Sequence, residues 1–418
     1  MKNKLLKAFL LLWIIAIPCS LIILHMPGVE RRVLSIVTEI GLIAGIEWEV
    51  ASIRESGLDA EALNNAVLSV LADDTRALLL IKNDAIIYEW YAEGLDQYSR
   101  FQLAAAAKPL VGGLLLGKAL EQGVLVLDQP VAEFLPAWKK DPDKSRITFR
   151  QLASHTSGME DVPFYGISPR KHKELWRKTY ERNLETRFKL AQTTVPLAVS
   201  PGTRYIYSGC GYYILSYTIT RAFRQNQTMK SDLRTLYRRE IMEPLGIGLA
   251  NWEIGYGDSH FVDGMTLYSI GSGTSMTARA VARVAQMIKN RGRFQKRTIM
   301  QETVVEQLLR PAPVKEAQAQ ESGMSPITAI GWYLNTNGFF RGLPRDAIIA
   351  YGVGPQVAVI SRSLNVILVR IGIPDERKLF REGDDRDLFV FLEPVFEALA
   401  GPGLNPENRE SGLGNPEI

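Results

Sequence analysis

The chain is poor in cysteine, has little net charge and contains no internal repeat. Its two cysteines are Cys19 and Cys210, and Cys19 lies inside an apolar run near the N-terminus, which excludes an intrachain disulfide as a stabilising device. A chain of 418 residues can bury a core without one. The formal net charge of +4 gives no argument for nucleic-acid binding. The apolar and charged fractions, 46% and 22%, are typical of a globular domain.

Six segments follow one another along the chain in an informative order. Ala77–Tyr91 holds two apolar runs around an Asn83-Asp84 pair and predicts a β-hairpin. The other five segments are Arg100–Pro136, Ile147–Asp161, Pro201–Ser216, Ser272–Phe294 and Ala347–Gly372. Together they resemble the penicillin-binding proteins and class C β-lactamases, a family with esterase-like and 6-aminohexanoate-dimer-hydrolase-like branches. The order and spacing of all six segments make the resemblance specific, whereas no single segment would.

The resemblance places a nucleophile where this chain has none. Enzymes of that family carry a Ser-x-x-Lys turn, in which the lysine lies one helical turn after the serine and faces the same cleft. Residues 102–108 read Gln-Leu-Ala-Ala-Ala-Ala-Lys, so Lys108 takes the lysine position and Ala105 that of the nucleophile. Alanine has no oxygen with which to attack a carbonyl carbon. The resemblance also implies neither a metal nor a cofactor.

The Tyr207-Ser208-Gly209 stretch resembles the second catalytic motif, Tyr-Ser-Asn. Tyr207 takes the position of the tyrosine that assists the lysine in accepting the serine proton, and Gly209 replaces an asparagine that would touch lysine and substrate. Ser208 is a poor substitute nucleophile, because in an extended segment its side chain points away from Tyr207. Cys210 is more typical of a buried small hydrophobic residue than of a nucleophile. The resemblance implies that His155 is a structural turn residue rather than a base or a metal ligand.

The third motif departs from the family as well. A common form reads Gly-His-Gly-Gly-Gln, and this chain has Gly352-Val353-Gly354-Pro355-Gln356. Val353 removes a polar side chain, and Pro355 has no N–H group. We align the strand-side donor of the oxyanion hole to the N–H of Gln356; in a register one residue earlier Pro355 would take that place, and one donor would be lost. Residues 209, 352–354 and 356 are therefore the predicted ligand-binding positions.

The resemblance implies an α/β (α+β) domain with the β-lactamase/transpeptidase-like fold over residues 58–400. Its central antiparallel sheet would join the N-terminal hairpin to C-terminal strands, and a mostly helical subdomain would span about 94–292. The ligand cleft would lie between the two parts. The expected C-terminal strands are Ala329–Asn335, Gln356–Ile360 and Val366–Ile371, followed by a closing helix over Arg386–Ala400.

The N-terminal residues 1–30 predict a membrane anchor or an uncleaved signal. Ala8–Met26 is apolar, carries no Asp, Glu, Lys or Arg and is about long enough to span a bilayer. A cleaved signal peptide would be shorter and would end in small residues. Lys2, Lys4 and Lys7 favour a cytoplasmic N-terminus, which would place the main domain in the periplasm and the protein in the inner membrane as a single-pass protein.

Three other stretches allow only general expectations. Residues 31–57 form a connector that is too interrupted to span a membrane and could be an interfacial helix. Pro169–Lys189 is dense in Arg, Lys and His, which is typical of a solvated helix face and also compatible with a cationic rim for anionic ligands or headgroups. Residues 401–418 resemble a disordered tail.

Three functions fit these observations. The protein could be a membrane-anchored relative of the serine hydrolases that binds a small-molecule, peptide or ester ligand without turnover. It could be an active esterase or amidase in which Ala105 stands in place of an original serine. It could also be a non-catalytic envelope scaffold with a vestigial cleft. No pattern identifies the substrate or a protein partner.

Overall fold

The computed structural model describes residues 46–71, 74–160, 184–226, 232–354, 356–373 and 385–400. Strands β1 (Thr75–Lys82) and β2 (Ala85–Tyr91) pair antiparallel, from Ala77 opposite Tyr91 to Lys82 opposite Ala85. The two turn residues, Asn83 and Asp84, both have positive φ, 52° and 65°, as a tight two-residue hairpin turn requires. The predicted hairpin is therefore confirmed.

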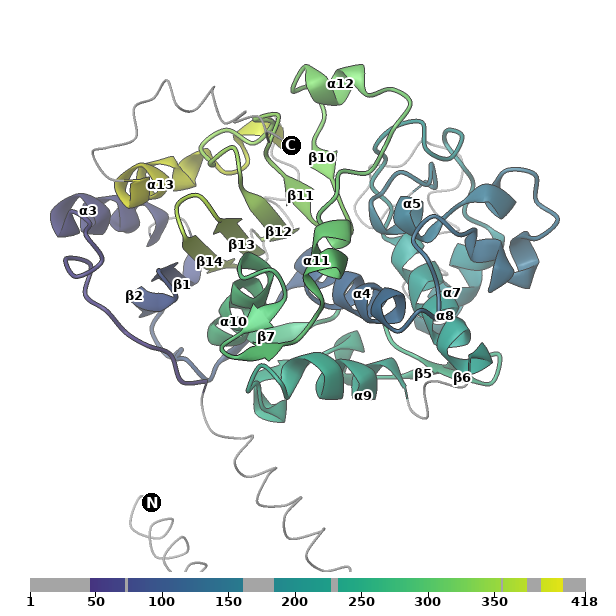
Figure 1. Ribbon diagram of the computed structural model, residues 1–418, viewed down its shortest axis with the longest axis horizontal. Coiled ribbons are helices and arrows are strands. Elements are labelled where there is room, and N and C mark those ends of the chain that lie inside the picture. Colours follow the sequence, from purple (N-terminus) through teal and green to yellow (C-terminus); the bar gives the residue numbers. More distant parts are fainter. Residues whose placement is uncertain are drawn as a thin grey trace, which may run out of the picture.

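The hairpin is one edge of a seven-stranded antiparallel sheet with the order β10-β11-β12-β13-β14-β1-β2. The N-terminal strand β1 lies between β2 and the last strand of the chain, so the sheet joins the two ends of the domain, as the resemblance implied (Figure 1). The C-terminal strands are β10 (Ile327–Thr328), β11 (Tyr333–Leu334), β12 (Ile348–Gly352), β13 (Gln356–Ser361) and β14 (Val366–Gly372).

Alternating side chains of the sheet enter two separate hydrophobic cores. In β1, Leu78 and Leu80 join the core that includes α3 (Ala60–Leu71) and α13 (Glu393–Ala400). Ala77, Leu79 and Ile81 join the larger core on the other face, which holds α10 (Ala278–Lys289) and the helical subdomain. This period of two is the signature of a sheet covered on both faces, and Figure 1 shows α3 and α13 on the side away from α10.

The helical subdomain occupies one end of the molecule (Figure 1). Its helices are α4 (Leu114–Glu121), α5 (Phe149–Ala153), α7 (Leu184–Thr193), α8 (Cys210–Gln225) and α9 (Leu233–Tyr237). Short strands flank them: β3 (Arg100–Gln102), β4 (Trp252–Glu253), β5 (His260–Val262), β6 (Met265–Leu267) and β7 (Ser275–Thr277). Beyond these lie β8 (Arg293–Phe294), β9 (Arg297–Thr298), α11 (Glu302–Leu308) and α12 (Gln318–Glu321). Helix α10 lies within the predicted range of this subdomain but packs on β1, β13 and β14.

Three local expectations differ from the structure. The strand expected over Ala329–Asn335 is instead two short strands on either side of Gly331, whose φ is +76° and whose backbone packs against Pro109. The closing helix begins at Glu393, just before Pro394, and is preceded by single 3-10 turns, because proline is tolerated only in the first turn of a helix. The folded domain already includes Ile46, which is buried, and the Val50–Ile86 bridge, so it begins before residue 58.

Some predictions fall outside the described residues: the anchor over Ala8–Met26, most of the connector, the basic stretch 169–183, Pro355 and the tail 401–418. In the part of the chain that the structure describes, no helix has both the length and the apolar character needed to cross a bilayer.

Candidate functional site

Ala105 lies in a tight turn between β3 and α4. The turn consists of a 3-10 segment, η1 (Ala104–Ala106), and a π-helical segment, η2 (Lys108–Gly113). The N–H of Leu103 donates to the carbonyl of Thr274 at 2.8 Å, which ties the turn to the segment before β7. Ala104 has a φ of +47°, a conformation that costs a residue with a Cβ about 1–2 kcal/mol. The backbone is therefore strained next to Ala105, the residue that the sequence aligns with the nucleophile.

Lys108 and Tyr207 meet beside this turn. The Lys108 ammonium donates to the Tyr207 hydroxyl at 2.7 Å and to the carbonyl of Gly271 at 3.1 Å. It also lies 4.8 Å from the centre of the Tyr207 ring and 5.4 Å from that of Tyr212. Only 5% of Lys108 is exposed, so these rings and oxygens replace much of the water around its charge. The two side chains, 99 residues apart in the chain, form the kind of pair that moves a proton.

His155 packs against the Tyr207 ring and fixes its position. Its imidazole stacks on the Tyr207 ring with centroids 4.5 Å apart, and its Nδ1 accepts the N–H of Ser208 at 3.1 Å. Burial, together with the nearby Lys108 charge, holds the pKa of His155 well below its usual range. The ring is therefore neutral, with the proton on Nε2 because Nδ1 is an acceptor. His155 has a φ of +59° and acts as a buried turn residue, as the resemblance implied.

Gly352, at the end of β12, packs against the backbone of the turn that contains Ala105. A Cβ built on Gly352 would lie 2.2 Å from the carbonyl oxygen of Leu103, 2.8 Å from the nitrogen of Ala106 and 3.0 Å from that of Ala105. The strand therefore passes directly against the backbone at the nucleophile position, where an oxyanion hole needs two N–H groups.

Side chains of β13 and β14 hold the hairpin of the third motif by hydrogen bonds to its backbone. Gln356 lies in β13 opposite Gly352, and its buried side chain donates to the carbonyls of Gly372 and Gly354, at 3.0 and 3.4 Å. Arg370 donates to the same Gly354 carbonyl at 3.3 Å and to the Thr75 hydroxyl at 3.0 Å. The side chain of Gln356 thus braces the hairpin, and its N–H as the strand-side donor stays a prediction.

The two alternative nucleophiles point away from Ala105 or are enclosed. The hydroxyl of Ser208 donates to the carbonyl of Glu160 at 3.1 Å, and Ser208 is buried. Cys210 is buried in the first turn of α8, and Gly209 precedes it as the N-cap. The hydroxyl oxygens of Tyr205 and Tyr333 lie 3.1 Å apart, and the Tyr205 ring meets the His155 ring edge to face. Burial raises the pKa of both tyrosines, so they are neutral hydrogen-bonding groups at physiological pH.

The contacts of Tyr212 and Gly271 with the site could not be predicted from the sequence. Tyr212 lies so close to Gly112 and Gly271 that a Cβ on either glycine would be within 2.7 Å and 2.5 Å of its side chain, and its hydroxyl donates to Ala153. Gly271 itself accepts from Lys108. No local pattern marks a glycine carbonyl as the partner of a distant lysine. Among the described residues there is no group of three or more His, Cys, Asp or Glu side chains that could hold a metal ion.

Comparison with known proteins identifies the family to which this fold belongs. Residues 74–343 match the family model described as Beta-lactamase. The chain belongs to the beta-lactamase family. The match includes Ala105, Lys108 and Tyr207 and ends before the third motif. This chain therefore has the serine-hydrolase fold, and Ala105, the residue that the sequence aligns with the nucleophile, lies inside the matched range.

Curated relatives match over parts of their length. The chain is 27% identical over 170 residues to an N-acetylmuramyl-L-alanine amidase of Bacillus subtilis (strain 168), which is 37% of this chain and 36% of that protein. It is 29% identical over 205 residues to a probable fimbrial assembly protein FimD, serogroup H1, of Dichelobacter nodosus, or 46% and 49% of the two chains. The chain thus spans less than half the length of these relatives.

Solved structures match over nearly their whole length. A putative beta-lactamase from Bacteroides dorei DSM 17855 has a TM-score of 0.61 at 21% identity, covering 82% of this chain and 99% of that one. EstCE1, a hydrolase with promiscuous acyltransferase activity, has a TM-score of 0.60 at 15% identity and coverage of 82% and 98%. A penicillin binding protein from Bacillus halodurans has a TM-score of 0.56 at 16% identity and coverage of 80% and 99%. At these identities the likeness shows the fold.

Proposed function

We propose that this protein is a non-hydrolytic member of the beta-lactamase family, which binds a small molecule, peptide or ester reversibly in the cleft around Ala105. The observation that carries the proposal is the combination of a missing hydroxyl with an otherwise assembled site. Ala105 has only a methyl group, while Lys108 still donates to Tyr207 at 2.7 Å. Such a site can hold a carbonyl compound by hydrogen bonds, but it cannot form an acyl-enzyme through residue 105.

Two costs favour a retained ligand site over a vestigial one. The strained φ of Ala104 costs free energy in the folded state, and so does the burial of the Lys108 charge. A scaffold whose cleft had no role would gain stability by relaxing both. The names of relatives include an amidase and putative D-alanyl-D-alanine carboxypeptidases, which supports an amide or ester as the ligand class.

The test is binding without a covalent adduct. We expect a peptide ending in D-alanyl-D-alanine, or an aliphatic ester, to raise the melting temperature. A ligand at 100 times its Kd adds about 2.7 kcal/mol, which is roughly 4 °C for a domain of this size, because the entropy of unfolding grows with chain length. Intact mass spectrometry after incubation with a fluorophosphonate or with penicillin G should show the unmodified mass.

The matched variants are Lys108→Met, which should abolish the ligand-induced shift, and Lys140→Met at an exposed site, which should not. A stoichiometric adduct on Tyr207, Ser208 or Cys210 would contradict the proposal. If no ligand of either class shifts the melting temperature of the folded protein, the scaffold function is the better account.

We further propose that Ala8–Met26 anchors the protein in the inner membrane with its main domain in the periplasm. The support is the length and lack of charge of this run and the three lysines before it. The mature protein is then expected to retain its N-terminal Met-Lys and to stay with the membrane fraction after a high-salt wash. Recovery of a soluble form that begins after residues 19–30 would show cleavage instead.

A further inference from the structure

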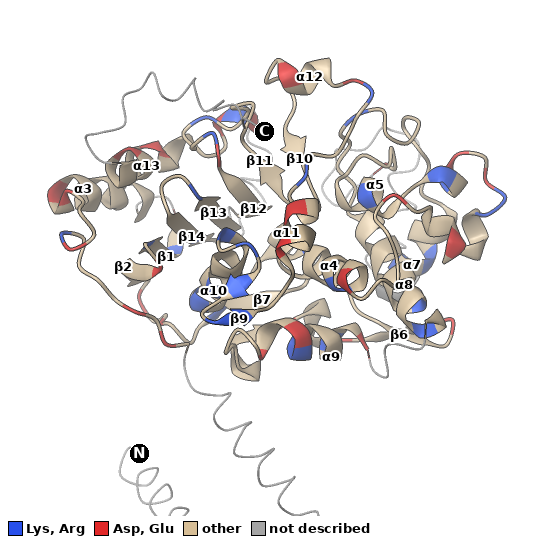
Figure 2. Cartoon of the chain, in the orientation of Figure 1, with Lys and Arg blue, Asp and Glu red and all other residues tan. Residues whose placement is uncertain are grey.

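A pocket that none of the candidate site residues line lies on the face where the described chain begins. Its volume is about 320 Å³. Figure 2 shows Lys and Arg residues gathered on β9 and the adjoining part of α10, close to this face. The pocket is lined by Glu47, Glu243, Pro244, Gly246, Arg283, Phe294, Gln295 and Arg297.

Arg283 is the buried cation of this pocket. Only 7% of it is exposed. Its guanidinium lies between two aromatic rings, 4.7 Å from the centre of Trp48 and 4.5 Å from that of Phe294. It donates to the backbone carbonyls of Leu245, at 3.2 Å, and Glu47. Burial, with a smaller contribution from the charge of Arg279, lowers the pKa of Arg283 to about 10.

Arg283 lacks the counter-ion that its neighbour has. Arg279, one turn earlier on α10, forms a two-pronged ion pair with Glu89, with N–O distances of 2.8 and 2.6 Å. Within the described chain no carboxylate lies within ion-pair distance of Arg283, and its buried Nε has no hydrogen-bond partner. A buried guanidinium whose contacts are neutral carbonyls and aromatic rings is a site that an anion would complete.

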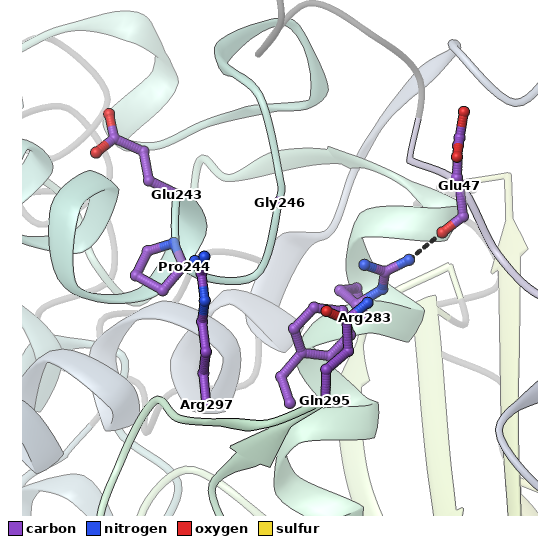
Figure 3. A pocket seen from close by; sticks show the side chains of 8 residues that line it. Glu47, Glu243, Pro244, Gly246, Arg283, Gln295 and Arg297 are labelled. Atoms are coloured by element: carbon purple, nitrogen blue, oxygen red, sulfur yellow. Dashed lines mark hydrogen bonds between the residues drawn. The ribbon is translucent and has the colours of Figure 1, made fainter. Parts of the chain in front are cut away.

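Arg297 adds a second positive charge to the pocket lining. It is exposed on the β8–β9 hairpin, as are Arg293 and Lys296, which do not line the pocket. None of the three forms an ion pair with a described residue. The carboxylate of Glu243 is 3.3 Å from Arg238. Figure 3 shows that the carboxylates of Glu47 and Glu243 point away from the guanidinium groups of Arg283 and Arg297. The pocket therefore presents two guanidinium groups with Gly246, which has no side chain, between them.

We propose that this pocket binds a phosphate group, clamped between Arg283 and Arg297. Planar guanidinium groups match the geometry of phosphate oxygens through paired N–H donors. The pocket lies beside the first described residues of the chain, because Glu47 lines it and Trp48 packs on Arg283. The chain that precedes Ile46, which includes Ala8–Met26, is joined to the domain at these residues. An anionic phospholipid headgroup is therefore the favoured source of the phosphate, a choice that rests on the proposed membrane attachment.

The experiment uses the full chain in a neutral maltoside detergent. Thermal melting is followed with dihexanoyl phosphatidylglycerol, with dihexanoylglycerol, which lacks the phosphate, and with inorganic phosphate. We expect the phospholipid to raise the melting temperature by several degrees in a concentration-dependent way, and the glycerolipid to leave it unchanged. Arg297→Gln should weaken phospholipid binding about tenfold, and Arg283→Lys should also weaken it. Arg54→Gln, at an exposed arginine before α3, should bind like the parent.

Each outcome decides a different part of the proposal. Because Arg297 is exposed, its loss should leave the fold intact, so unchanged affinity in Arg297→Gln would overturn the phosphate site. An equal response to the two lipids would do the same. Inorganic phosphate bound as tightly as the phospholipid would support the phosphate site and overturn the membrane source. None of these results depends on the ligand of the Ala105 cleft.

Discussion

Replacing Ala105 with serine should give the protein a measurable esterase activity. The new hydroxyl would lie in the strained turn after Ala104, one turn before Lys108, whose ammonium is already 2.7 Å from the Tyr207 hydroxyl. Once the Lys108–Tyr207 pair has released one proton, its free amine or phenolate can accept the serine proton. A placed proton acceptor contributes about 10²–10⁴-fold to such reactions, so we expect hydrolysis of p-nitrophenyl acetate at least about 10²-fold above the parent. β-Lactam turnover should stay low, because Gly209 and Val353 replace the polar residues of the second and third motifs.

Two further variants show whether the gain comes from the assembled site. Lys108→Ala in the Ala105→Ser background should remove it, because nucleophile and base act as a unit. Ala104→Ser is the matched control: it adds the same hydroxyl one residue away, where it should give no activity. If Ala105→Ser melts like the parent and shows no esterase activity, the site has decayed beyond its nucleophile, and the scaffold function gains support.

Replacing Gly352 with alanine should destabilise the domain strongly. The added methyl would meet the carbonyl oxygen of Leu103 at 2.2 Å and the nitrogen of Ala106 at 2.8 Å. Both are backbone atoms, so either β12 or the turn must move. Overpacking of this kind costs about 3 kcal/mol, which lowers the melting temperature by roughly 4 °C for a domain of this size. The esterase activity of Ala105→Ser should disappear in the same background, because the shift separates the strand from the turn.

Gly94→Ala separates packing from backbone strain. Gly94 has a φ of +76°, and no atom lies within 4 Å of a Cβ built on it. Its replacement should therefore cost only the left-handed conformation, about 1 kcal/mol. Urea denaturation of both variants measures the difference. Equal free energies of unfolding for the two variants would show that the turn yields easily, and that Gly352 does not fix the geometry of the site.

The fold was largely predictable because its signals are local. The β1–β2 hairpin was predicted from two apolar runs within Ala77–Tyr91 and the Asn83-Asp84 pair that forms its turn; the alternation of the β1 side chains between two cores became visible only in the structure. Boundaries were less predictable where a distant contact decided them. The strand expected over 329–335 is broken at Gly331 because its backbone packs on Pro109, and nothing near residue 331 encodes the position of residue 109.

The sequence by itself determined that residue 105 cannot attack a carbonyl carbon, because alanine has no hydroxyl group. It also determined the family, through the order of its motifs. Only the tertiary structure decided what surrounds that position: the Gly271 carbonyl and Tyr212 ring at Lys108, the His155 ring behind Tyr207, and Gly352 against the turn. It likewise decided that Arg283 is buried without a carboxylate while Arg279, on the same helix, has one. These contacts join residues far apart in the chain, and the sequence pattern of one helix or strand does not show which distant residues will pack against it.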